Sequence, residues 1–366
     1  MSPAAVARPE DTSGYHGLRA IMSFVYGRSS AVGGFTFIAA IAACGGETLP
    51  PPLKDGGRDA AVDAVDSASA SDAAPHDASP ISCSTDAPGA GKNCGTSGAD
   101  DCCASLSVSG GSFLRNYDGV NLFEKAEPAT TSPFYLDKYE VTVGRFRAFV
   151  EAYPGSRPKQ GDGAHPKHPE SGWNPSWFLP NTQAALRQQL ATDSGCKVLT
   201  WTDQSGPNEK LPINCVPWYD VFAFCAWDRG RLPTSAEWEF AAGAGSEQRV
   251  FPWSQPPTSA TVDATFAAYE PTPAYLSGPL PVGSFPKGAS AFGQFDLAGN
   301  VEEVMLDGEV LPGNCDDCVE PATNGRHDMR GGSWDGPYSN MYIVIENVTR
   351  ESDRFRYQGA RCARDP

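Results

Sequence analysis

Glycine and proline interrupt this chain so often that long helices and long strands are disfavoured. Of the 366 residues, 38 are glycine and 32 are proline. Proline removes a backbone donor, and glycine loses more conformational entropy than any other residue when it is held in a regular element. Hydrophobic residues still make up 40% of the chain, which is enough for a substantial core. The sequence therefore predicts short, mixed elements joined by many turns.

The charge of the chain limits its partners. Acidic residues outnumber basic ones by 44 to 28, which gives a formal net charge of -16. A phosphate backbone would be repelled, so nucleic acid is not an expected partner. The surplus suits a secreted or surface protein or one that binds cations, although it could serve solubility alone.

The first 43 residues have the features of a lipoprotein signal peptide. Arg19 and Arg28 precede an apolar run at 31–43, which suits a signal peptide but is too short to span a bilayer as a stable helix. The run ends at Cys44 in a pattern similar to a bacterial lipobox, where the leader is cut before a lipidated cysteine. We expect removal of 1–43 and lipidation of Cys44, which would anchor the protein to a bacterial membrane, extracytoplasmically, in the periplasm or at the cell surface. The alternative is a buried apolar strand.

Residues 44–82 are expected to form a disordered tether. They consist mostly of Ala, Asp, Ser and Pro and include no aromatic residue. Such a segment has too little apolar surface to offset the entropy lost on ordering. Residues 83–104 contain four cysteines and are expected to staple the tether to the folded part.

Ten cysteines remain if Cys44 carries lipid, and an even number in an oxidising compartment favours disulfides. Cys196 and Cys215 bracket a loop of suitable length for one bridge. Cys315 and Cys318 form a CxxC motif, which could be a disulfide or half of a zinc site. No second CxxC and no histidine at ligand spacing accompanies it, so we favour the disulfide. The complete pairing stays open.

Residues 105–366 form the predicted globular region. Residues 134–153 begin with the apolar pattern of a strand and then change to helical spacing. Residues 216–230 and 232–245 predict two short helices, each ended by a glycine, the second with a threonine or serine N-cap.

Four segments of this region carry a family pattern: Tyr139-Glu140-Val141-Thr142, "VPWYDVFAFCAWDRGRLPTSAEWEFAA" (216–242), "FGQFDLAGNVEE" (292–303), and "RGGSW" (330–334) with "GARCARD" (359–365). In this order they resemble the formylglycine-generating enzyme or sulfatase-modifying factor domain family over about 105–366. The resemblance implies an α+β, loop-rich variant of the C-type lectin fold with little regular secondary structure. It also implies a disulfide between Cys225 and Cys362.

The resemblance also locates the place of an active site. Active members of the family oxidise a sulfatase cysteine to formylglycine with dioxygen and a copper ion held by two thiolates. Counted from Trp334, the two thiolate positions hold Gly336 and Met341. Glycine has no side chain, and a methionine thioether can bind Cu(I) but cannot become a thiolate. Copper is therefore not an expected cofactor.

Calcium is the cofactor that the resemblance favours. Residues 296–303 resemble the family's calcium loop, with carboxylates from Asp296 and Glu303 and main-chain carbonyls from Gly299 and Val301. Hard oxygen ligands and a flexible glycine suit this ion. The alternative is a surface turn whose acidic side chains only accept local N–H groups.

Together these features predict a membrane-tethered lipoprotein with a calcium-stabilised, non-catalytic domain that acts as a binding or scaffold module. Trp334, Tyr338 and Tyr342 are the expected lining of a cleft for a peptide or a glycan. The competing interpretation is a formylglycine-generating or related oxidoreductase with a rearranged metal site. Fold alone does not decide between them.

Overall fold

The computed structural model describes residues 79–84, 87–120, 126–192, 195–273, 277–308, 313–320, 322 and 324–366. The chain divides into two compact units, 1–71 and 72–366, and every described residue belongs to the second. The predicted signal peptide, Cys44 and nearly all of the predicted tether therefore lie outside the described residues. Within the described ranges, no helix is both long and apolar enough to cross a membrane.

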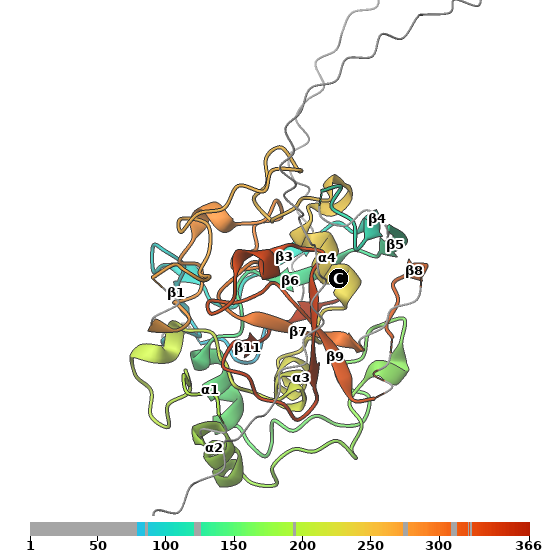
Figure 1. The fold of residues 1–366 in the computed structure, drawn as a ribbon. Helices are drawn as coiled ribbons and strands as arrows, with labels where there is room; N and C mark the ends of the chain where they lie inside the picture. Colours follow the sequence, from blue (N-terminus) through green and yellow to red (C-terminus); the bar gives the residue numbers. More distant parts are fainter. Residues whose placement is uncertain are drawn as a thin grey trace, which may run out of the picture. The chain divides into compact units, whose positions relative to one another are not determined.

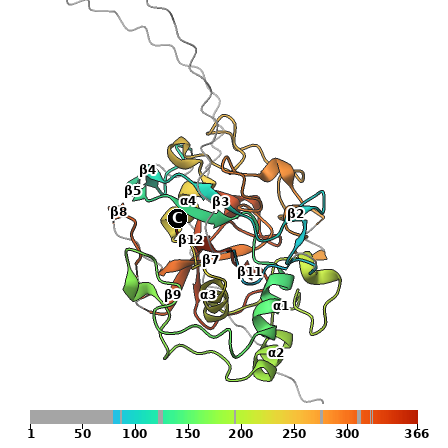
Figure 2. The same cartoon turned by 180° about the vertical axis from the view of Figure 1, so that it is seen from behind.

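Short strands form four small sheets in the described part of the chain (Figures 1 and 2). The largest sheet has four strands in the spatial order β10 (Glu346–Arg350), β9 (Arg326–Arg330), β7 (Glu302–Gly308) and β11 (Gln358–Gly359). Two sheets have three strands: one has the order β12 (Ala363–Arg364), β6 (Phe134–Asp137) and β3 (Ser105–Val108), and the other has the order β4 (Gly111–Arg115), β5 (Glu127–Thr131) and β8 (Cys315–Asp316). The smallest sheet pairs β1 (Lys92–Cys94) with β2 (Asp100–Asp101). The pairs β11–β7 and β5–β8 are parallel and the others are antiparallel.

The helices are equally short. The α-helices are α1 (Val143–Glu151), α2 (Gln183–Ala191), α3 (Trp218–Trp227) and α4 (Ser235–Ala242), and the 3-10 helices are η1 (Pro169–Ser171), η2 (Pro207–Lys210), η3 (Gly245–Glu247), η4 (Pro286–Gly288) and η5 (Tyr338–Met341). The predicted α+β, loop-rich architecture is confirmed.

Local sequence signals explain where the helices begin. Thr234 caps α4: its side chain accepts from the Glu237 N–H, and the Glu237 carboxylate accepts from the Thr234 N–H. Within 134–153, the strand ends at Asp137, and α1 begins at Val143 after its N-cap Thr142. The predicted strand-to-helix change is therefore present, with a connecting segment between the two elements.

Aromatic side chains fill the largest core cluster, which joins α1 to α3. Phe146 and Phe149 of α1 and Phe224 of α3 are fully buried, with the Phe146 and Phe224 rings stacked at 5.5 Å. Burial of each such side chain stabilises the fold by about 1.5–3 kcal/mol. A second cluster lies around α4 and includes Trp238.

All ten described cysteines form disulfides: Cys83–Cys103, Cys94–Cys102, Cys196–Cys215, Cys225–Cys362 and Cys315–Cys318. The last three are the bridges expected from the sequence. Cys225–Cys362 links α3 to the chain immediately before β12, across a separation of 137 residues.

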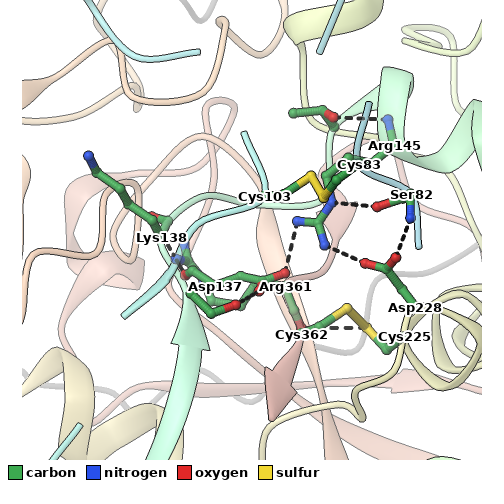
Figure 3. A network of polar contacts seen from close by, with 12 residues as sticks. Ser82, Cys83, Cys103, Asp137, Lys138, Arg145, Cys225, Asp228, Arg361 and Cys362 are labelled. Atoms are coloured by element: carbon green, nitrogen blue, oxygen red, sulfur yellow. Dashed lines mark hydrogen bonds and ion pairs between the residues drawn. A yellow bond between two sulfur atoms is a disulfide. The ribbon is translucent and has the colours of Figure 1, made fainter. Parts of the chain in front are cut away.

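The cysteine-rich segment packs directly on the domain, together with the residue before it, Ser82, which the sequence analysis assigned to the tether. The backbone N–H of Ser82 donates to the Asp228 carboxylate, and the Arg145 guanidinium of α1 donates to the same carboxylate and to the Ser82 hydroxyl (Figure 3). A Cβ at Gly144 would lie 2.1 Å from the Pro88 carbonyl oxygen, so only glycine permits this approach. The segment is therefore fixed to α1 and to the end of α3.

Candidate functional site

Two loops meet at the place where the sequence locates an active site. One follows β9 and contains Gly331 and Gly332, with φ of 97° and 62°. A Cβ at Gly332 would lie 2.8 Å from the Asn340 backbone, which explains this glycine. The other loop precedes β7. The Gly299 N–H donates to the Gly331 carbonyl (2.9 Å), and the Trp334 N–H donates to the Asn300 carbonyl (2.9 Å). The predicted cleft and the predicted calcium loop are thus neighbours.

Trp334, which follows Gly331 and Gly332 in the loop after β9, is buried. Its side chain is 3% exposed and packs with Ala268, and the Arg356 guanidinium lies 5.7 Å from its ring centroid. Arg356 is held there by Asp335, whose carboxylate accepts from Nε at 2.5 Å. The expectation that Trp334 offers a ring face to a ligand is therefore not met, because the core and Arg356 cover it.

The other predicted cleft residues differ in exposure. Tyr338 is 45% exposed, whereas Tyr342 is half-buried and stacks on Phe251 at 5.1 Å. Gly336 accepts a backbone hydrogen bond from the Glu270 N–H at 2.8 Å, and Met341 is completely buried. The two positions counted as thiolate positions thus hold a backbone contact and a core side chain.

The loop before β7 has the backbone of a tight, glycine-dependent turn. Asp296, Gly299 and Asn300 all have positive φ, and a Cβ at Gly299 would lie 2.4 Å from the Ala268 carbonyl oxygen. The buried Asp296 carboxylate accepts from the Gly283 N–H at 2.6 Å. Burial raises the pKa of Asp296 to about 6.

Glu303, the second predicted calcium ligand, is paired with a cation of the protein. Its carboxylate accepts from Arg361 Nε and Nη2, at 2.6–2.9 Å, and from the Trp238 indole N–H at 2.9 Å. Each carboxylate oxygen therefore already accepts two hydrogen bonds.

Glu140 is part of this site, although its role could not be inferred from the sequence pattern. Its carboxylate accepts from the Asn300 side chain (2.6 Å) and from the Val301 N–H (3.0 Å). Burial, and then the nearby carboxylates of Asp296 and Glu303, raise the pKa of Glu140 well above its usual value. Its position inside the Tyr139–Thr142 family segment was the available signal.

Three buried carboxylates, Glu140, Asp296 and Glu303, therefore surround one guanidinium, that of Arg361. The described residues contain no group of three or more His, Cys, Asp or Glu side chains arranged to hold a metal ion. The predicted calcium site needs only two carboxylates, because main-chain carbonyl oxygens supply its other protein ligands. What the geometry establishes is a buried cluster of three carboxyl groups with one guanidinium.

Residues 92–366 match the sulfatase-modifying factor enzyme 1-like domain. The chain belongs to this family, and the match begins within the cysteine-rich segment rather than after it.

Individual relatives agree with this assignment. The chain is 29% identical to mouse inactive C-alpha-formylglycine-generating enzyme 2, over 71% of this chain and 85% of the relative. It is 28% identical to the formylglycine-generating enzyme of Thermomonospora curvata, over 71% of this chain and 93% of the relative. Among solved structures, PvdO from Pseudomonas aeruginosa shares the fold, with a TM-score of 0.50 and 24% identity over 72% of this chain and 94% of PvdO.

Proposed function

We propose that this protein is a membrane-tethered, extracytoplasmic lipoprotein whose domain acts as a binding or scaffold module without the copper chemistry of its family. One observation supports the part of the proposal that concerns copper. The two positions counted as thiolate positions hold Gly336 and the buried Met341, and every described cysteine is in a disulfide. The described residues therefore offer no pair of thiolates at these positions, which is the kind of ligand that Cu(I) prefers. The mouse relative named as inactive supports the same interpretation.

A peptide or a glycan is the ligand class that we propose for this module. Tyr338 supports it, because it is one of the few large hydrophobic side chains of the described residues that are exposed. Its ring meets that of Tyr342 edge-on at 6.2 Å. Aromatic surfaces with a polar tip suit both ligand classes. Loss of binding to a peptide or glycan array in Tyr338→Ala, with an unchanged melting temperature, is the test.

The proposed tether rests on the lipobox-like sequence at Cys44. Labelling of the protein with a radioactive fatty acid tests it, because Cys44→Ser removes the acceptor thiol. Equal labelling of both proteins would rule out an anchor at this position.

We also propose that calcium stabilises the domain through Asp296, Gly299, Val301 and Glu303. The acidic cluster supports this proposal, since a bound cation would favour the ionised form of its three buried carboxyl groups, which have one guanidinium as partner. Glu303 would then share its oxygens between Arg361 and the ion.

Chelation is expected to destabilise the domain. At calcium about 100-fold above its Kd, binding contributes about 2.7 kcal/mol, so EDTA should lower the melting temperature by about 5–10 °C. Asp296→Asn keeps an acceptor for Gly283 but removes a charge, so it should abolish the difference between calcium and EDTA. Asp162→Asn, at an exposed aspartate outside the cluster, is the matched control and should keep the difference between calcium and EDTA. A melting temperature that does not respond to EDTA in the unmodified protein would contradict the calcium site.

The oxidase alternative is tested directly with copper. The purified domain, incubated with copper, dioxygen and a peptide carrying the sulfatase motif, is expected to leave the mass of the peptide cysteine unchanged. The double variant Gly336→Cys/Met341→Cys is the positive comparison, because it restores two thiols at the counted positions and should bind Cu(I) in competition with a chelator. Conversion of the cysteine to an aldehyde by the unmodified domain would establish the alternative, an oxidoreductase with a rearranged metal site.

A further inference from the structure

The Cys315–Cys318 bridge differs from the other disulfides of the described residues. Its cysteines are three positions apart, whereas the other four separations are 8, 19, 20 and 137. Cys318 is partly exposed, whereas three of the other bridges join two fully buried cysteines. It is therefore the bridge that closes the shortest loop, and one of its two cysteines is partly exposed.

Reduction of this bridge would cost the fold little. A disulfide stabilises mainly by restricting the unfolded chain, and this effect is smallest for the shortest loop. β8 is also held without it. Cys315 pairs with Ala129 of β5, and the Asp317 N–H donates to the Thr130 carbonyl at 2.8 Å. The Asp317 carboxylate is bound by Ser132 and by the Lys167 ammonium. The two thiols would therefore stay close to each other after reduction.

An open cleft of about 550 Å³ lies beside Cys315. Its lining comes from β4, β5 and β8 and includes Ser112, Leu114, Thr130, Asn314, Cys315 and Asp316. Figures 1 and 2 show these three strands together, on the same side of the domain as α4. The cleft offers room, hydroxyl groups and an apolar surface for an extended segment of another protein next to the disulfide.

We propose that Cys315 and Cys318 form a thiol–disulfide exchange site that reduces an accessible disulfide of a partner protein. The Cys318 thiolate attacks one sulfur of the partner's disulfide, which forms a mixed disulfide and releases a partner thiolate that takes up a proton. The Cys315 thiolate then attacks Cys318 Sγ, which restores the Cys315–Cys318 bond and releases the second partner sulfur as a thiolate that takes up a proton. Two electrons have then passed to the partner. A second protein dithiol reduces the Cys315–Cys318 bridge again by the same kind of exchange and is itself oxidised to a disulfide.

Graded reduction of the full protein with dithiothreitol, followed by alkylation and mass spectrometry, tests the accessibility. Cys315 and Cys318 should be alkylated at a reductant concentration about tenfold below that needed for Cys225 and Cys362, with an unchanged circular dichroism spectrum. Cys83–Cys103, which also has a partly exposed cysteine, is the matched control. Reduction of either control bridge before or together with Cys315–Cys318 would overturn the proposal.

Reduction of insulin by dithiothreitol, followed as turbidity, tests the activity itself. The unmodified protein should accelerate it, and Cys315→Ser and Cys318→Ser should not. Cys315→Ser should also form a mixed disulfide with oxidised glutathione about tenfold faster than Cys318→Ser, because it leaves the exposed thiol. An easily reduced bridge without acceleration of insulin reduction would mean a structural staple and would overturn the exchange function.

Discussion

Replacement of Asp228 with asparagine is expected to lower the free energy of unfolding by about 3–5 kcal/mol, the cost of breaking a buried ion pair by removing one partner. The Asp228 carboxylate accepts from Arg145 Nη2 at 2.7 Å and from the Ser82 N–H at 2.6 Å (Figure 3). It also accepts from Arg364 Nη2 at 3.1 Å. Asp137 binds the same two guanidiniums from the other side. Two buried carboxylates thus balance two buried guanidiniums, and the variant would leave one cation without a counter-charge.

Urea denaturation measures this loss. The matched control is Asp203→Asn, which removes the partner of Arg187 in a pair where both side chains are solvent-accessible, and it should cost about 0–1 kcal/mol. A loss of stability no larger than that of the control would mean that the four charges contribute little to the fold.

The sequence predicted those features that depend on neighbouring residues. Thr234 and Glu237 are three residues apart and specify the start of α4, and the predicted helix over 216–230 is present as α3. Glycine and proline frequency predicted short elements, and four segments in order predicted the family that the match over 92–366 establishes.

Contacts between distant residues were not predictable in this way. Asn300 donates to Glu140 across 160 residues, and Arg361 reaches Glu303 across 58 residues. No local spacing shows that Glu303 has a guanidinium partner, so the sequence predicts calcium ligands in this loop but not the ion pair between Glu303 and Arg361.

Trp334 illustrates a second limit. An aromatic residue beside two glycines has the same local sequence whether its ring faces solvent or the core. The structure places the ring against Ala268 and under Arg356, because the chain returns to this loop only after β10.

Stability is expected to fall as the pH rises from 5 to 8. Burial raises the pKa of four carboxyl groups to about 7: Asp220, Glu239, Glu302 and Asp307. In the unfolded chain such groups titrate near 4. Between these values the folded state holds more protons than the unfolded state, so each rise in pH favours unfolding. The stabilisation is complete below the unfolded pKa and is lost as the pH passes through about 7.

The expected decrease is about 3 kcal/mol or more between pH 5 and pH 8, since one unit of difference between folded and unfolded pKa corresponds to about 1.4 kcal/mol. Carboxyl groups with a lowered pKa, such as Asp137 and Glu237, act in the opposite direction only below about pH 4. Urea denaturation at each pH should be carried out in EDTA, so that cation binding does not add its own pH dependence.

Glu302→Gln isolates one of these groups. The Glu302 carboxylate accepts from the Asn347 side chain at 2.6 Å, and glutamine can present an oxygen to the same donor. The variant cannot titrate, so it should be more stable than the unmodified protein at pH 8 and should show a shallower decrease from pH 5. Glu170→Gln, at an exposed side chain, should leave the slope unchanged over this range. Stability that rises from pH 5 to pH 8 would show that these carboxyl groups are ionised in the folded protein, with cations or water compensating their burial.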